Sequence, residues 1–87
     1  MTKIQELKAL DKTIKRAESI TSVVTADARA SYEYLQEERS QGDDELIEMA
    51  LSKYNIDVDK MHTAVEGLTA LTDKRCKLTE GLAKEGE

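Results

Sequence analysis

Apolar and small residues recur through the first forty positions at alternating steps of three and four, which is the spacing of a coiled-coil heptad. In chain order, the repeat consists of Leu7, Leu10, Ile14, Ala17, Thr21, Val24, Ala28, Ser31 and Leu35. The segment Thr2-Lys3-Ile4-Gln5 matches a capping box with Thr2 as the N-cap, and Gly42 suits the far end. The pattern predicts one helix from about residue 3 to 40, roughly 55 Å long at 1.5 Å per residue.

The middle of this helix is its weakest part. Residues 19–25 are rich in β-branched and hydroxyl side chains, which favour a helix less than leucine or alanine does. A bend or an end in this segment is therefore the alternative to one continuous helix. The heptad positions form a seam, the stripe of apolar and small residues along which a second helix would pack. We favour continuity, because this seam has small residues at Thr21, Ala28 and Ser31, where a second helix could approach closely.

Two further helices are predicted in the second half. Asp43-Asp44-Glu45 supplies a cap and first-turn negative charge for a short helix over residues 44–54, and Asn55 is a natural stop. Asp57 or Asp59 would then cap a helix over residues 58–83. Its heptad positions are Met61, Ala64, Leu68, Leu71, Arg75, Leu78 and Leu82. Arg75 is the one charged residue on that seam, so it needs a carboxylate partner or a ligand.

These elements predict an all-α protein: a long helical hairpin or a slim three-helix bundle with coiled-coil-like seams. Residues 1–87 form a single helical domain in which helices 3–40 and 58–83 pack antiparallel and helix 44–54 closes one end. The chain has no Pro, Phe or Trp, which permits long helices and removes the usual filling of a globular core. The first helix is too long for an 87-residue globule to cover, so we expect a homo-oligomer.

Charge and cysteine content restrict the environment and the partners. Residues 41–87 carry the whole net charge of −5, which makes binding to nucleic acid unfavourable for the chain as a whole. No apolar run approaches the roughly 18 residues of a membrane span. The start of the chain lacks a signal-peptide pattern, and Cys76 is its only cysteine. We therefore expect a cytoplasmic protein, in its own cell or in that of a host.

Catalytic and metal-binding chemistry is poorly represented. His62 has no second histidine or neighbouring cysteine and is expected to face solvent. Cys76 has cationic neighbours but no base or oxyanion site, and is expected to be a partly buried structural thiol. We expect neither an enzyme nor a bound cofactor or metal.

Two groups of charged residues are candidates for binding. Acidic residues around helix 44–54, together with a tyrosine, form a possible docking surface for a larger protein partner. They are Asp43, Asp44, Glu45, Glu48 and Tyr54. The alternative is a basic group on the first and third helices that would hold a nucleotide or other anion between chains. That group is Lys12, Arg16, Lys74 and Arg75.

In general character, acidic, Trp-free and coiled-coil-like, the chain is similar to small helical accessory proteins encoded by phages. Such proteins act as assembly chaperones or as inhibitors of host machinery. The resemblance lies in the composition of the whole chain and in no particular residue. It favours a non-enzymatic interaction protein, whether inhibitor, adaptor or assembly chaperone, and the alternative is an oligomer that sequesters a small anionic ligand.

Overall fold

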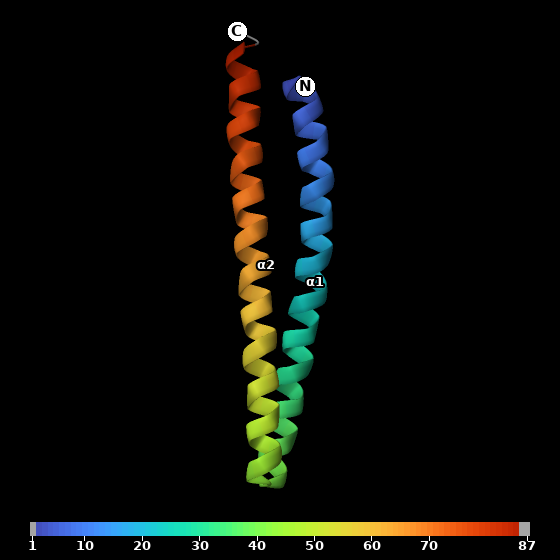
Figure 1. Cartoon of the computed structure of the whole chain (residues 1–87), viewed down its shortest axis with the longest axis vertical. Coiled ribbons are helices and arrows are strands. Elements are labelled where there is room, and N and C mark those ends of the chain that lie inside the picture. The colour runs from blue at the N-terminus through green and yellow to red at the C-terminus, as the bar shows by residue number, and fades with distance from the viewer. Residues whose placement is uncertain (1, 86–87) are drawn as a thin grey trace.

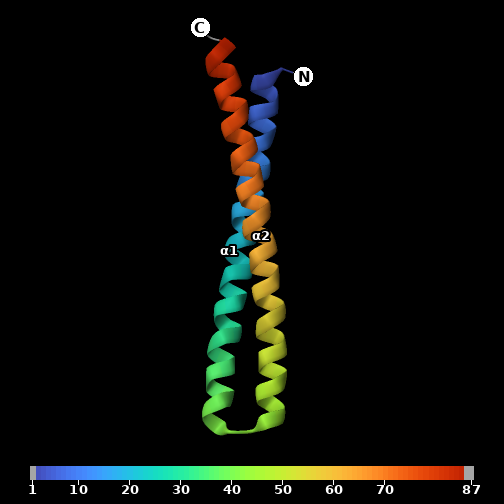
Figure 2. The same ribbon diagram turned by 90° about the vertical axis from the view of Figure 1, so that its left-hand side faces the viewer.

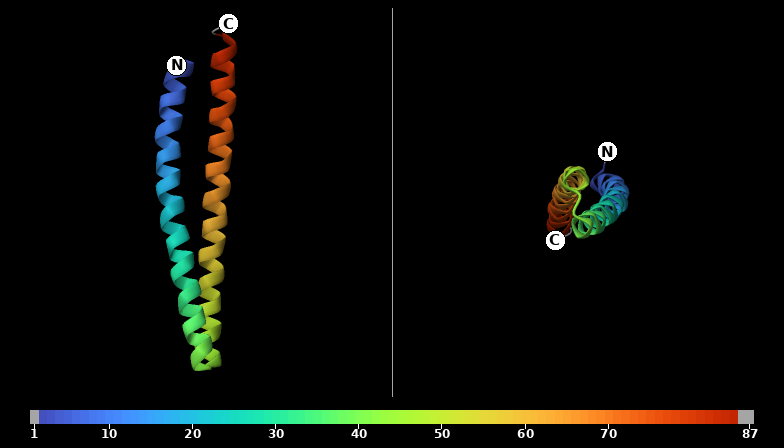
Figure 3. Two further views of the ribbon diagram at one scale, coloured as in Figure 1. Left: turned by 180° about the vertical axis from the view of Figure 1, so that it is seen from behind. Right: turned by 90° about the horizontal axis from the view of Figure 1, so that it is seen from below.

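The molecule is a hairpin of two long antiparallel helices, α1 (Lys3–Gln41) and α2 (Asp44–Glu85) (Figure 1). The computed structural model describes residues 2–85 and measures 65 × 16 × 15 Å. The two ribbons cross near mid-length, and the view along the axis is only two helices wide (Figures 2 and 3). The all-α, long-hairpin prediction is confirmed.

Helix α1 forms as predicted and is continuous through residues 19–25. At its start Thr2 accepts from the Gln5 backbone while the Gln5 side chain accepts from the Thr2 backbone, which completes the capping box. In the weak middle, hydroxyl groups bond to the helix itself. Ser19 donates to the Lys15 carbonyl at 3.2 Å and Thr21 to the Ala17 carbonyl at 2.7 Å. These hydroxyls therefore need no partner outside the helix, and the segment stays helical.

The turn between the helices is set by one glycine and one aspartate. Gly42 adopts φ 78°, a left-handed conformation, and its N–H donates to the Glu38 carbonyl at 3.2 Å. Asp43 Oδ1 then accepts from the backbone N–H groups of Glu45 at 3.1 Å and Leu46 at 3.3 Å. Helix α2 can thus start within two residues of the end of α1, because each terminus has its own cap.

Replacing Gly42 by alanine tests this turn. The space around Gly42 is open, so the expected loss comes from backbone strain alone and amounts to about 1 kcal/mol of unfolding free energy. Gly81→Ala is the matched control inside α2, where a helical alanine is expected to stabilise by up to about 1 kcal/mol. Urea unfolding followed by circular dichroism measures both. Equal shifts of the same sign would contradict the role of the positive φ.

The predicted break at Asn55 is wrong, because α2 runs without interruption from Asp44 to Glu85. The heptad of the second half continues backwards without a change of phase through Asp57, Tyr54, Ala50 and Ile47. An asparagine inside a helix costs only about 0.7 kcal/mol relative to alanine, whereas a break would remove the later residues from the seam. No third helix closes the end of the hairpin within the described residues.

The core is a thin seam. Its buried apolar residues are Leu10, Ile14, Ala28, Leu35 and Ala50. Most other seam residues keep partial contact with water, because two helices cannot surround a side chain. The accessible surface is 6610 Å², whereas a compact monomer of this 9.7 kDa mass exposes about 5,100 Å². The hairpin alone therefore leaves roughly 1,500 Å² more surface in water than a globule of its size.

Candidate functional site

A polar cluster interrupts the apolar seam between the turn and mid-length. The Ser31 hydroxyl donates to Asp57 Oδ2, and Lys53 Nζ lies 3.1 Å from the same oxygen. Ser31 and Asp57 are buried on facing seam positions of α1 and α2. Asp57 was predicted as a helix cap, and only the uninterrupted heptad phase of α2 could have placed it on the seam. A buried polar contact between facing positions fixes which residues of the two helices lie opposite each other.

The hydrogen bond from Ser31, and then that from Lys53, lowers the pKa of Asp57 from its ordinary value of 3.8. A lowered folded-state pKa stabilises the hairpin above the unfolded value and loses that contribution as pH falls through the folded value. We expect Asp57→Asn to be less stable than the natural chain near neutral pH, with the difference shrinking below about pH 4. Urea midpoints across this range measure it, with the exposed Asp59→Asn as control. A difference independent of pH would contradict it.

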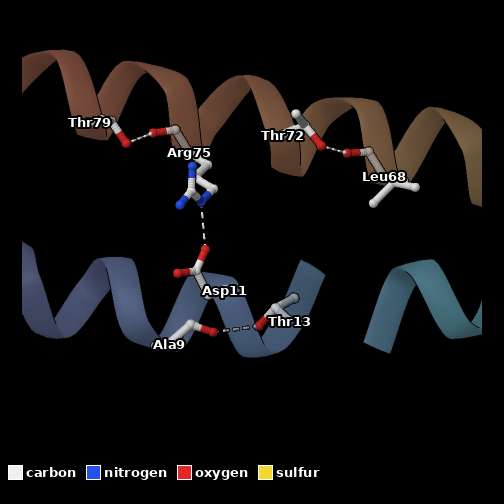
Figure 4. A network of polar contacts seen from close by, with 7 residues as sticks. All are labelled: Ala9, Asp11, Thr13, Leu68, Thr72, Arg75 and Thr79. Carbon is white, nitrogen blue, oxygen red and sulfur yellow. Dashed lines mark hydrogen bonds and ion pairs between the residues drawn. The ribbon is translucent and has the colours of Figure 1, made fainter. Parts of the chain in front are cut away.

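Arg75, the charged residue on the α2 seam, has a carboxylate partner on α1. Its Nε lies 2.6 Å from Asp11 Oδ1 (Figure 4). This bond raises the pKa of Arg75 above its ordinary value, and the guanidinium stays charged. Both side chains are over two-fifths exposed, so the pair contributes to register more than to stability. The sequence indicated the need for a partner but not which residue supplies it.

Both long sides of the hairpin are hollowed: a hollow of about 470 Å³ beside Thr21, Thr25 and Leu68 lies on one side, and a run of three follows the other side. With seam residues at heptad positions a and d (Leu7 and Ile47 at a), the side with the run of three, here called the groove side, consists of the c and g positions of both helices. Near the termini a hollow of about 640 Å³ is lined by apolar residues including Ala9, Leu10 and Leu71. Further hollows of about 450 and 460 Å³ follow toward the turn. Exposed apolar residues of the groove side are Ile20, Val23, Tyr34, Met49 and Ile56.

Charge on the groove side is divided between the helices. The c and g positions of α1 carry three acids and one base: Glu6, Asp27, Glu37 and Arg16. The same positions of α2 carry five bases and no acid: Lys53, Lys60, Lys74, Lys77 and Lys84. Within residues 2–85, Asp27, Lys60 and Lys74 form no ion pair. One helix therefore presents an acidic strip and the other a basic strip beside the same groove.

The predicted acidic surface lies at the turn end. Asp43, Asp44, Glu45 and Glu48 are all exposed there, whereas Tyr54 is half-buried with its ring centroid 5.7 Å from that of Tyr32. Sequence reasoning missed Glu38, which is only 7% exposed on the seam beside the turn. Its Oε2 atom is buried with no hydrogen-bond partner among the described residues. The end of the hairpin thus combines exposed acids with one unsatisfied carboxylate oxygen.

The basic residues of the alternative site do not converge. Lys12 falls at the outward-facing f position of α1, and Arg75 is occupied by Asp11. Lys74 lines the terminal hollow, and Arg16 shares that groove side one turn of helix away. Anion binding stays a prediction. A thermal-shift screen with nucleotides at millimolar concentration tests it, and an unchanged melting temperature would contradict it.

The isolated histidine and cysteine are both on the outside. His62 is exposed, as predicted. Cys76 is also exposed, and the expected partial burial of its thiol is wrong. Because Arg75 occupies the seam, the next residue along the helix turns away from α1. Within the described part of the chain, neither residue lies beside a set of side chains that suits catalysis.

Within residues 2–85, no cluster of three or more His, Cys, Asp or Glu side chains could hold a metal ion. Neither helix contains a stretch apolar enough, over the length needed, to cross a membrane. Comparison with family models, curated proteins and solved structures gives no match to this chain.

Proposed function

We propose that this chain is a non-enzymatic interaction protein, an inhibitor, adaptor or assembly chaperone that acts by binding a larger protein in the cytoplasm. The observation that carries the proposal is the surplus of surface on a hairpin too thin to bury its own apolar residues. Large exposed apolar patches on a small protein mark interaction surfaces. The compositional resemblance to phage-encoded accessory proteins favours the same kind of role.

The turn end is the surface proposed to bind the larger partner. Asp43, Asp44, Glu45 and Glu48 lie within one and a half turns of helix and attract a basic surface. The unsatisfied Oε2 of Glu38 supports this choice, because a buried carboxylate oxygen is costly unless a donor reaches it. An arginine or lysine of the partner would supply that donor. Tyr54, packed on Tyr32 beyond these acids, adds apolar area beside them.

Affinity capture from the source cell with matched variants tests the proposal. The binding variant carries Asp44→Asn, Glu45→Gln and Glu48→Gln, and it keeps Asp43 because that residue caps α2. The control carries Asp59→Asn, Glu66→Gln and Glu80→Gln, which remove equal charge from the outward f positions of α2. We expect the natural chain and the control to retain one protein stoichiometrically, and the binding variant to retain it at least about tenfold less. Equal retention by both variants, or no stoichiometric protein, would overturn the proposal.

A further inference from the structure

We propose that the groove side binds the groove side of a second copy of this chain. The product is a four-helix bundle in which α1 of each chain lies against α2 of the other and both turns lie at the same end. A standard interface buries about 800 Å² per partner, and the hairpin exposes roughly 1,500 Å² more than a compact monomer of its mass. The surplus surface is therefore large enough for a stable dimer.

The charge pattern of the groove side indicates that its binding partner is a second copy of the chain. The groove side carries an acidic strip on α1, with Asp27 and Glu37, and a basic strip on α2, with Lys60 and Lys74. A surface with one acidic and one basic strip is complementary to itself when a twofold axis runs parallel to the helices. Each acidic strip then lies against the partner's basic strip, and the complementary contact is made twice.

The register agrees with this arrangement. Residues at equal height on the two helices are given by the contacts Asp11–Arg75 and Tyr32–Tyr54, whose residue numbers both add to 86. A twofold axis parallel to the helices preserves height, so Asp27 of one chain lies level with the partner's Lys60.

The sizes of the side chains on the groove side also fit the arrangement with both turns at the same end. Ile20 and Val23, which protrude from α1, lie level with the partner's Thr63 and Gly67 on the α2 groove side. A Cβ atom added at Gly67 would meet nothing within 4 Å, so space is open there. Bulky residues of one chain therefore face small residues of the other, as helix packing requires.

The rival arrangement places the turns at opposite ends and sets α1 against α1 and α2 against α2. Lys74 would then lie near the partner's Lys60, and the five lysines of each α2 strip would face the five of the other with no acid between them. Gly67 would also lie opposite the partner's Thr63, another small residue, across a gap. Like charges and a void disfavour this pairing.

One charge effect opposes the proposed arrangement, because it brings two acidic turn ends together. Those acids are exposed, and at physiological ionic strength charges are screened over about 8 Å. The groove charges lie inside the interface, where water and ions are displaced and electrostatic interactions are stronger. The charges of the groove side therefore outweigh the repulsion between the turn ends.

Paired turns also affect partner binding. This effect rests on the proposed function, in which the turn end binds a larger protein: the dimer then presents two acidic turn ends side by side. Two linked sites raise the apparent affinity for a partner with two basic patches, without any new contact. Self-association itself does not depend on that partner, so its test can fail or succeed separately from the capture experiment.

Sedimentation equilibrium of the purified chain tests the proposal, with helicity checked by circular dichroism. We expect twice the chain mass of 9.7 kDa. Lys60→Glu is expected to raise the dimer dissociation constant at least about tenfold, because its contact with the partner's Asp27, made twice, becomes acid against acid. Adding Asp27→Lys to that variant reverses the contact and is expected to restore the dimer. Lys12→Glu makes the same net charge change away from the groove side and is expected to leave dimerisation unchanged.

A folded monomer of the natural chain at micromolar concentration overturns the proposal. So does a lysine-to-glutamate groove variant that dimerises as well as, or better than, the natural chain, because that result is expected when α2 pairs with α2. Failure of the variant carrying both Lys60→Glu and Asp27→Lys to recover the dimer would also contradict the paired strips.

Discussion

Leu35→Ala is expected to remove about 2–3 kcal/mol of unfolding free energy, a large part of the total stability of a chain this short. Leu35 is 2% exposed and lies on the seam near the turn, where Ala50 is 1% exposed. Truncating its side chain loses buried apolar area and leaves a cavity that a two-helix seam has few atoms to refill. Urea unfolding followed by circular dichroism, at one fixed protein concentration, measures the change.

Ile4→Ala is the matched control for Leu35→Ala. It also truncates a large aliphatic residue of α1, but Ile4 is 59% exposed. We expect its effect to stay within about 0.5 kcal/mol. A loss below about 1 kcal/mol at Leu35, or equal losses at the two positions, would show that the seam near the turn does not hold the hairpin together.

Glu38→Leu is expected to act in the opposite direction and stabilise the hairpin by about 1–2 kcal/mol. The glutamate is 7% exposed, and its Oε2 atom has no hydrogen-bond partner among the described residues. A leucine of similar size avoids the desolvation of that carboxylate and suits the seam position. The same urea measurement applies, with Glu33→Leu on the outward face as the control of equal charge change, expected within about 0.5 kcal/mol.

The Glu38 variant also bears on function. If Glu38 receives a donor from a basic partner, Glu38→Leu should be more stable and yet bind that partner less well. Residues kept for function at a cost in stability behave in this way. An unstable Glu38→Leu would instead mean that the carboxylate has a favourable role within the hairpin itself.

The sequence predicted α1 because its end signals and its heptad agree. The capping box, the uninterrupted heptad and Gly42 all indicate the same helix, and they outweigh the weak helix formers of residues 19–25. At residues 54–58 the signals conflict. Asn55 and the neighbouring aspartates resemble a helix boundary, while the heptad steps from Tyr54 to Asp57 to Met61 continue. The periodic pattern prevailed, since it reflects the packing of about forty residues whereas the stop signal reflects one.

The groove side could not be read from the sequence in advance. The residues at c and g positions of each helix follow from the heptads, but which of them face each other depends on the register of the hairpin. That register is shown by Ser31 with Asp57 and by Asp11 with Arg75, four residues far apart in the chain. Once it is known, the acidic strip of α1 and the basic strip of α2 fall beside one groove. For the same reason, no local signal marked Glu38 as buried.

The hairpin is proposed to act through its surfaces, and its groove side to pair with that of a second copy, with both turns at the same end. The exposed single cysteine, Cys76, allows a direct test by spin-label distance measurement on the natural sequence. With the turns at the same end, the two labels lie level across a four-helix bundle, and we expect a distance of about 25–30 Å. With the turns at opposite ends, position 76 is offset by about 35 Å along the axis, which gives roughly 40 Å or more. A distance of that length, or no dipolar coupling between chains, would contradict the account.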